Sequence, residues 1–248
     1  MNNKSIFHYT KDYSTICRII EEGFAPSFCI EQICTTDKCI KFSVPMISFC
    51  DITLSKADEH KNKYGKFAIG VKKDWAIKNN INPIYYLNIE TGISNSIVSI
   101  LNAHSNYIKT CDEKNTDFEM LNYIKTVSHF KNYKGDINPK LKNITFYDEK
   151  EWRYVPVFKN ECGTESCKIF TEEKFEEIIK TYPHKPHFRE CALKIKLSDI
   201  THIVVPDKKS KYDLINCLSS NQKISNNKNN FNDLLTKILT YKEIVYDL

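Results

Sequence analysis

The chain of 248 residues contains no run of 18 apolar residues, and its first ten residues, MNNKSIFHYT, lack the apolar core of a signal peptide. The first absence argues against a membrane-spanning helix and the second against secretion. A hydrophobic content of 41% with 12% aromatic residues is typical of a globular protein and not of a disordered one. We therefore expect a cytoplasmic protein with no membrane partner.

Spacings that would bind metal are also missing. The ten cysteines include no CxxC pair, the histidines form no HExxH motif, and no Asp/Glu cluster suits magnesium. These absences disfavour a zinc-dependent deaminase and a metal-dependent nuclease. We expect no metal, and we expect the cysteines of a cytoplasmic protein to stay reduced.

The net charge of the chain does not point to one class of partner. The formal net charge is +5, and the basic residues are dispersed along the chain apart from short clusters. Such a balance is compatible with a nucleic-acid or nucleotide partner but does not require one. No helix-turn-helix is evident, so binding to operator DNA is disfavoured.

The hydrophobic pattern predicts one α+β domain over residues 1–248, with about eight strands. Helical spacing of apolar residues predicts a helical insertion at about 94–130, and an Asn/Ser/Lys-rich stretch predicts a low-complexity loop at about 219–230. Further expected elements are strands at 5–10, 44–50, 67–71, 191–197, 201–205 and 243–246, a loop at 25–41 and a helix at 171–180.

The segment ITFYDEKEWRYVPVF (144–158) stands out because a tight acidic turn separates two aromatic-rich extended runs. Glu151 falls on the first residue of the second run, where a sheet would hold the backbone while the side chain reaches a cleft. Strand alternation places Glu151 and Arg153 on one face and Trp152 on the other, in the core. The plainer alternative is an ordinary hairpin with a solvated glutamate.

Several motifs of the chain resemble the AbiGi family of abortive phage-infection proteins, which are described as antitoxins of a two-gene system. The resemblance covers most of residues 1–205, in family order, and does not extend to the last forty residues. The matching motifs are HYT (8–10), EEGFAPSFC (21–29), PMISFCDITLS (45–55), HKNKYGKFAIGVKKDWAIK (60–78) and FYDEKEWRYVP (146–156).

The same motifs look like the divergent ADP-ribosyltransferase fold of DarT-type toxins, which implies a mixed, split β-sheet core. That resemblance implies a histidine on the first strand, a hydroxyl residue on the second and a glutamate opening a later strand. Here Glu151 would be catalytic, stabilising the positive charge that builds on the ribose of NAD. The residues expected to bind NAD are His8, Thr10, Ser48, Tyr64 (or the aromatic Phe49) and Arg153, whose guanidinium could hold the pyrophosphate or tether Glu151.

Two functions from different classes follow. The first is an NAD-dependent ADP-ribosyltransferase in anti-phage defence, with NAD as substrate and a nucleic-acid or protein acceptor. The second is a non-catalytic antitoxin that binds a partner toxin, for example one from the same operon. The sequence does not name the acceptor or the partner.

Overall fold

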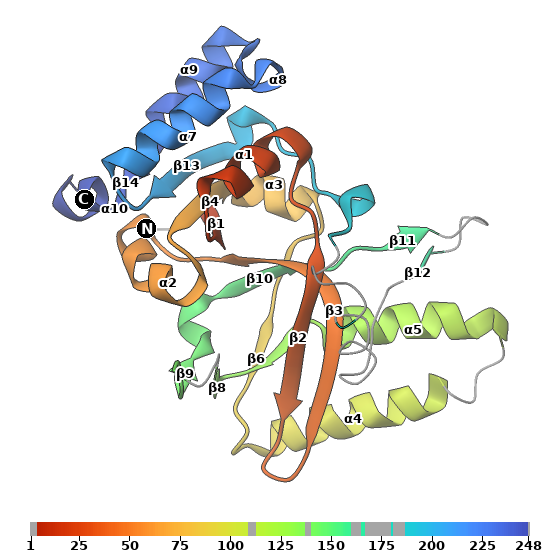
Figure 1. Cartoon of the computed structure of the whole chain (residues 1–248). Helices are drawn as coiled ribbons and strands as arrows, with labels where there is room; N and C mark the ends of the chain where they lie inside the picture. Colours follow the sequence, from red (N-terminus) through yellow and green to blue (C-terminus); the bar gives the residue numbers. More distant parts are fainter. Residues whose placement is uncertain are drawn as a thin grey trace. The chain divides into compact units, whose positions relative to one another are not determined.

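The computed structural model describes residues 4–108, 113–136, 140–159, 165–166, 180 and 187–247 (Figure 1). Helices and a mixed sheet confirm the α+β class. The chain divides into two compact units, each built from separate segments. Unit 1 comprises Met1–Ala25, Ser48–Ile81 and Ala192–Leu248, and unit 2 comprises Pro26–Ile47 and Asn82–Cys191. Because each unit is built from separate segments of the chain, this division does not test the expectation of a single domain, which stays a prediction.

The sheet of unit 1 contains the strands expected near its ends in sequence. Antiparallel β1 (Ser5–Thr10) and β4 (Phe67–Lys72) pair in full register, and β4 also pairs with antiparallel β13 (Ile200–Val205). The short β14 (Ile238–Thr240) adds a parallel strand beside β13. Gly70 lies where a Cβ atom would meet the side chains of Phe7 and Thr201, so this strand position requires glycine for close approach.

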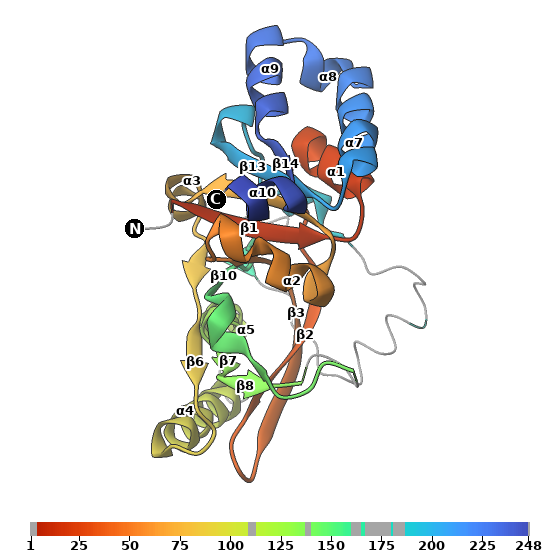
Figure 2. The same ribbon diagram turned by 90° about the vertical axis from the view of Figure 1, so that its left-hand side faces the viewer.

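Helices flank this sheet, and local sequence explains where several of them begin and end. Helix α1 (Tyr13–Glu22) starts at Asp12, whose carboxylate accepts the Thr15 N–H at 2.9 Å, and stops at Gly23 with φ of 91°. A short 3₁₀ turn (Leu54–Lys56), α2 (Ala57–Tyr64) and α3 (Lys73–Lys78) are further helical elements of this unit. Helix α7 (Lys208–Ser220) lies beside α1 in both Figure 1 and Figure 2.

Three expectations in the last part of unit 1 are wrong. The predicted loop at 219–230 is mostly helical, because it contains α8 (Gln222–Ser225) and the start of α9 (Lys228–Thr236). Asn221 and Asn227, which we took as loop composition, cap these helices with their side chains. The predicted strand at 191–197 keeps one isolated bridge, at Leu193, and the predicted edge strand at 243–246 lies within helix α10 (Tyr241–Asp247).

Unit 2 is organised around a long hairpin of β2 (Ser27–Cys34) and β3 (Cys39–Cys50, of which the last three residues belong to unit 1), paired from Ser27↔Met46 to Cys34↔Cys39. The predicted loop at 25–41 is therefore wrong. Its cysteines and scattered polar residues hid a strand in which Phe28 and Ile33 are buried on opposite faces, while Ile30, on the same face as Phe28, is exposed. The strand β2 is stabilised by its pairing with β3, and that pairing is a tertiary feature.

Two helices and several short strands make up the rest of unit 2 among the described residues. Helices α4 (Gly92–Ile108) and α5 (Glu113–Val127) confirm the helical insertion at 94–130. Strands β6 (Tyr85–Leu87) and β7 (Phe130–Asn132) form a parallel pair. Strands β5 (Asn82–Pro83) and β10 (Glu151–Tyr154) form an antiparallel pair. Strands β8 (Lys134–Gly135) and β9 (Ile144–Thr145) form a second antiparallel pair. Short β11 (Phe158–Lys159) pairs with β12 (Glu165–Ser166). The unit 2 core consists of Ile33, Phe42, Val44, Met46, Leu87, Val98, Leu101, Tyr123, Ile124, Val127 and Val155.

Cysteines behave differently from the expectation that all stay reduced. Two disulfides join Cys17 to Cys217, between α1 and α7, and Cys34 to Cys39, at the end of the β2–β3 hairpin. The expectation failed because sequence spacing does not reveal which cysteines face one another.

The expected helix at 171–180 lies outside the described residues except for Lys180. Among the helices that the structure describes, none has the length and apolar character needed to cross a membrane.

Candidate functional site

Strand β10 positions the glutamate that the sequence singled out. Glu151 is its first residue, as predicted, and follows a 3₁₀ turn (Phe146–Glu149) closed by Lys150 in the left-handed region with φ of 45°. Burial alternates along the strand, with Glu151 and Arg153 buried and Trp152 half-buried. The predicted faces are confirmed for the two charged residues, but Trp152 is not fully buried in the core as expected.

The carboxylate of Glu151 is buried, with 4% of the residue exposed, and lies between two cations. Its Oε1 accepts from Nε of Arg153 at 2.6 Å, and its Oε2 accepts from Nζ of Lys131 at 2.9 Å. The backbone is fixed too, because the Glu151 N–H donates to the Tyr86 hydroxyl at 2.7 Å and its carbonyl accepts from Ile84 at 3.0 Å. Glu151 is therefore neither a solvated hairpin glutamate nor a carboxylate that points into open solvent.

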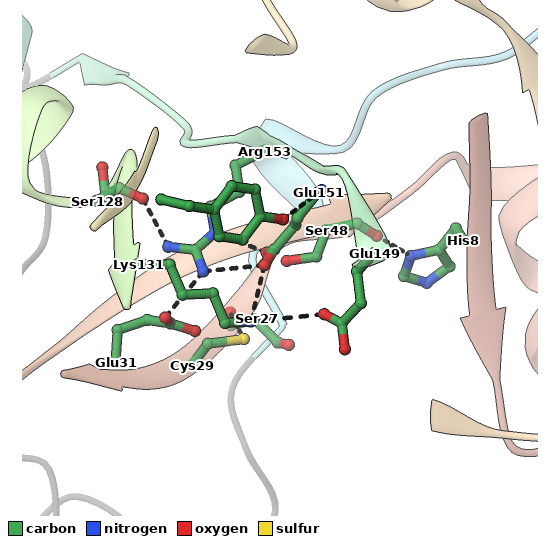
Figure 3. Close-up of polar contacts among 11 residues, drawn as sticks. His8, Ser27, Cys29, Glu31, Ser48, Ser128, Lys131, Glu149, Glu151 and Arg153 are labelled. Atoms are coloured by element: carbon green, nitrogen blue, oxygen red, sulfur yellow. Dashed lines mark hydrogen bonds and ion pairs between the residues drawn. The ribbon is translucent and has the colours of Figure 1, made fainter. Parts of the chain in front are cut away.

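The guanidinium of Arg153 is fully buried and joins three elements of unit 2 (Figure 3). Besides Glu151, it donates from Nη2 to Glu31 of β2 at 2.8 Å and from Nη1 to the Ser128 carbonyl after α5 at 2.7 Å. The side chain thus tethers the glutamate, one of the two roles expected for it. The N–H groups of a guanidinium form a rigid, planar fork, and this geometry suits the binding of carboxylates.

Lys131 on β7 completes the charged group. Its ammonium lies 2.9 Å from Glu151, 3.8 Å from Glu149 and 4.4 Å from the centre of the Phe146 ring. Three carboxylates thus surround two cations within unit 2, and we call Glu31, Lys131, Glu149, Glu151 and Arg153 the ion cluster. Each charged group in such a cluster needs a partner of opposite charge, because burying an unpaired charge costs folding free energy.

The protonation states follow from this packing. Burial alone raises the pKa of Glu151, but the charges of Arg153 and Lys131 outweigh it and hold that pKa well below its usual range. Burial likewise lowers the pKa values of Arg153 and Lys131, and the neighbouring carboxylates of Glu151 and Glu31 raise both above their ordinary values. All three groups are therefore charged at neutral pH.

Sequence reasoning found Glu151 and Arg153 but missed Glu31 and Lys131. A signal for Glu31 exists, because on β2 it falls between Cys29 and Ile33, on the strand face that packs against the unit 2 core. A lone carboxylate on an apolar strand face requires a buried partner. Lys131 gives no comparable signal, since β7 is only three residues long.

The other predicted residues, His8, Thr10, Ser48 and Tyr64, belong to unit 1. Nδ1 of His8 lies 2.9 Å from the Ser48 carbonyl, which fixes the imidazole, and burial lowers the His8 pKa so that the ring is neutral at pH 7. The Thr10 hydroxyl donates to the Asp12 carbonyl at 3.1 Å, in the turn that starts α1. Tyr64 stacks on His60 with ring centres 6.5 Å apart.

The structure thus brings His8 and Ser48 together, and it separately brings Glu151 and Arg153 together. Whether His8, Ser48 and Glu151 share one cleft stays a prediction. Within the described ranges, no group of three or more His, Cys, Asp or Glu side chains is arranged to hold a metal ion.

Comparison with known proteins assigns the chain to a family. A family model described as "Putative abortive phage resistance protein AbiGi, antitoxin" matches residues 22–206. The "Abortive phage resistance protein AbiGi" of Lactococcus lactis subsp. cremoris is 30% identical over 223 residues, which cover 82% of this chain and 88% of that protein. No solved structure matches the chain. The resemblance seen in the motifs is confirmed, and the chain belongs to the AbiGi family of abortive phage resistance proteins.

Proposed function

We propose that the chain acts in phage resistance as an antitoxin, which binds a partner toxin and catalyses no reaction of its own. The family description names an antitoxin, and that description supports a protein partner. The single observation that carries the proposal is the state of Glu151. The carboxylate expected to be catalytic is buried and has both oxygens bound by cations of its own unit.

A transferase would need that carboxylate for its substrate. To stabilise a ribosyl cation, Glu151 would have to contact the ribose at the moment when the nicotinamide bond breaks. Here Arg153 and Lys131 already neutralise its charge, at 2.6 and 2.9 Å. Separating a buried pair of this kind costs about 3–5 kcal/mol, so the arrangement favours a structural role.

Co-expression with the protein encoded by the neighbouring gene tests the proposal. We expect that neighbour to slow bacterial growth when expressed alone, and we expect the chain to restore growth and to co-purify with it as a stable complex. Failure of the chain both to bind its neighbour and to restore growth would contradict the antitoxin function.

A second candidate, the NAD-dependent ADP-ribosyltransferase, is favoured by one observation. Glu151 opens strand β10 and is ionised, as the resemblance to the DarT-type fold requires of its catalytic glutamate. In this function, NAD would be bound by His8, Thr10, Ser48, Tyr64 and Arg153. The hydroxyl of Thr10 and the guanidinium of Arg153 already have protein partners, which weakens the fit.

Release of free nicotinamide from NAD separates the two candidates. The antitoxin proposal expects no release by the purified chain, alone or mixed with lysate from phage-infected cells. Release that Glu151→Gln abolishes, in a variant whose circular dichroism shows a retained fold, would replace the antitoxin function with the transferase. Growth inhibition by the chain alone, relieved by the same variant, would point the same way.

A further inference from the structure

Three tyrosines of unit 2 contact one another in a row of rings. The rings of Tyr133 and Tyr147 are stacked, with centres 5.4 Å apart and planes 25° from parallel. The ring of Tyr86 meets Tyr147 at 77°, with centres 5.5 Å apart. We call Tyr86, Tyr133 and Tyr147 the tyrosine stack. Tyr147 remains 48% exposed despite both contacts, so part of this side chain is open to solvent.

Hydrogen bonds to the backbone hold the tyrosine stack in place. The Tyr86 hydroxyl accepts the Glu151 N–H at 2.7 Å, which ties this ring to the first residue of β10. The Tyr133 N–H donates to the Leu87 carbonyl at 2.7 Å, and the Tyr133 carbonyl accepts the Phe146 N–H at 2.9 Å. An aromatic surface that is fixed in this way loses little conformational freedom when a ligand stacks on it.

Exposed lysines border the tyrosine stack. Lys134 directly follows Tyr133, and the Lys150 N–H donates to the Tyr147 carbonyl at 3.2 Å. Lys142 lies just before β9, the strand that pairs with β8. None of these three lysines has an ion-pair partner among the residues that the structure describes. Their charges are therefore available to an anion.

The surface around the tyrosine stack is positive. Its exposed charged residues between positions 133 and 150 are four lysines and two aspartates, namely Lys134, Lys140, Lys142, Lys150, Asp136 and Asp148. Four positive and two negative charges leave an excess of two positive charges. Glu149 lies in the same stretch but is buried beside Lys131, which balances its charge. This surface therefore favours an anionic ligand.

Stacked rings and unpaired lysines together fit single-stranded nucleic acid. Each base offers a planar face that stacks on an aromatic side chain, and each phosphate is a counter-ion for a lysine. The bases of a duplex are stacked on one another, so their faces do not reach a side-chain ring. A protein partner matches only part of this surface, because lysine is depleted in protein–protein interfaces.

We propose that the tyrosine stack and its bordering lysines bind single-stranded nucleic acid. A base stacks on Tyr147, and the neighbouring phosphates lie against Lys134, Lys142 and Lys150. These contacts use the face of a base and the phosphates, which RNA and DNA share. The proposal does not depend on the antitoxin function, because the ligand is bound and not modified.

Fluorescence anisotropy of the full chain with a short labelled oligouridine and a short labelled oligothymidine tests the proposal. The wild-type chain should bind both single strands and should bind a duplex of the same length more weakly. Tyr147→Ala should weaken single-strand binding by about tenfold, the loss expected for one base stacked on one ring. Tyr147→Phe keeps the ring and should bind like the wild type. Circular dichroism checks that both variants fold.

Tyr85→Ala is the matched control for the lost tyrosine. Tyr85 is 67% exposed but precedes Tyr86 on β6, so its side chain lies on the opposite face of that strand. Its removal should leave the affinity unchanged. Equal loss of binding in Tyr85→Ala and Tyr147→Ala overturns the proposal, as does a wild-type chain that binds no single strand at low salt or binds the duplex equally tightly.

Salt dependence gives a second measurement that does not rest on the tyrosines. The slope of log affinity against log salt concentration should become shallower by about 0.7 in Lys134→Gln and again in Lys142→Gln, because each removes one phosphate contact. Lys125→Gln removes an exposed lysine of α5 and should leave the slope unchanged. Equal slopes in all three lysine variants would mean that the anion binds elsewhere and would overturn the proposal.

Discussion

Replacing Glu151 by glutamine removes one of three carboxylates that balance two buried cations. Glutamine keeps the volume, and its amide oxygen can still accept one hydrogen bond from Arg153 or Lys131. Arg153 also retains Glu31 at 2.8 Å, and Lys131 retains Glu149 at 3.8 Å. We therefore expect a loss near the lower end of the range of about 3–5 kcal/mol for breaking a buried ion pair. For a chain of this size, a loss of about 3 kcal/mol lowers the melting temperature by about 6–12 °C.

Thermal denaturation followed by circular dichroism measures this loss at pH 7. Glu21→Gln serves as the control, because it removes the same charge from an ion pair with Lys223 at the surface. Surface pairs of that kind contribute little to stability, so the control should melt close to the wild type. If Glu151→Gln also melted within about 1 °C of the wild type, the ion cluster would not stabilise unit 2 as described.

The pH dependence provides an independent check with a definite sign. The pKa of Glu151 in the folded chain is held below its ordinary value of 4.5, so the unfolded chain binds this proton more tightly. Stabilisation by Glu151 is then fully present above pH 4.5 and decreases as the pH falls below that value. The difference between wild type and Glu151→Gln should be constant above about pH 5 and shrink in acid. A difference that does not change with pH would refute the assigned charge state.

Three further predictions concern single side chains. Arg153→Met should destabilise the chain by about 3–5 kcal/mol in chemical denaturation, because it leaves buried carboxylates without their cation, and an effect under about 1 kcal/mol would contradict that role. Asn227→Ala should cost about 1 kcal/mol by removing the cap of α9, whereas Asn226→Ala, one residue earlier, should cost much less. The pKa of His8 is lowered by burial, so the wild type should lose stability as the pH falls below 6.5, and His8→Gln should reduce that slope in thermal melts.

Much of the local structure follows from short stretches of sequence. Asp12 and Gly23 mark the two ends of α1 because a carboxylate cap and a left-handed glycine act within one helical turn. Alternation in EWRY was enough to place Glu151 and Arg153 on one face of β10, since that periodicity belongs to any strand. Composition gave a wrong prediction at 219–230 because asparagine is common both in loops and at the starts of helices. Asn221 and Asn227 cap helices there.

The sequence by itself determined the α+β class, the AbiGi family through its motifs, and the strand position of Glu151, because these depend on neighbours a few residues apart. Only the tertiary structure decided what Glu151 and Arg153 contact. Arg153 meets Glu31 across 122 positions, and no periodicity in the chain encodes that distance. The same long-range pairing turned the expected loop at 25–41 into part of the β2–β3 hairpin, because a strand is stabilised by its partner more than by its own residues.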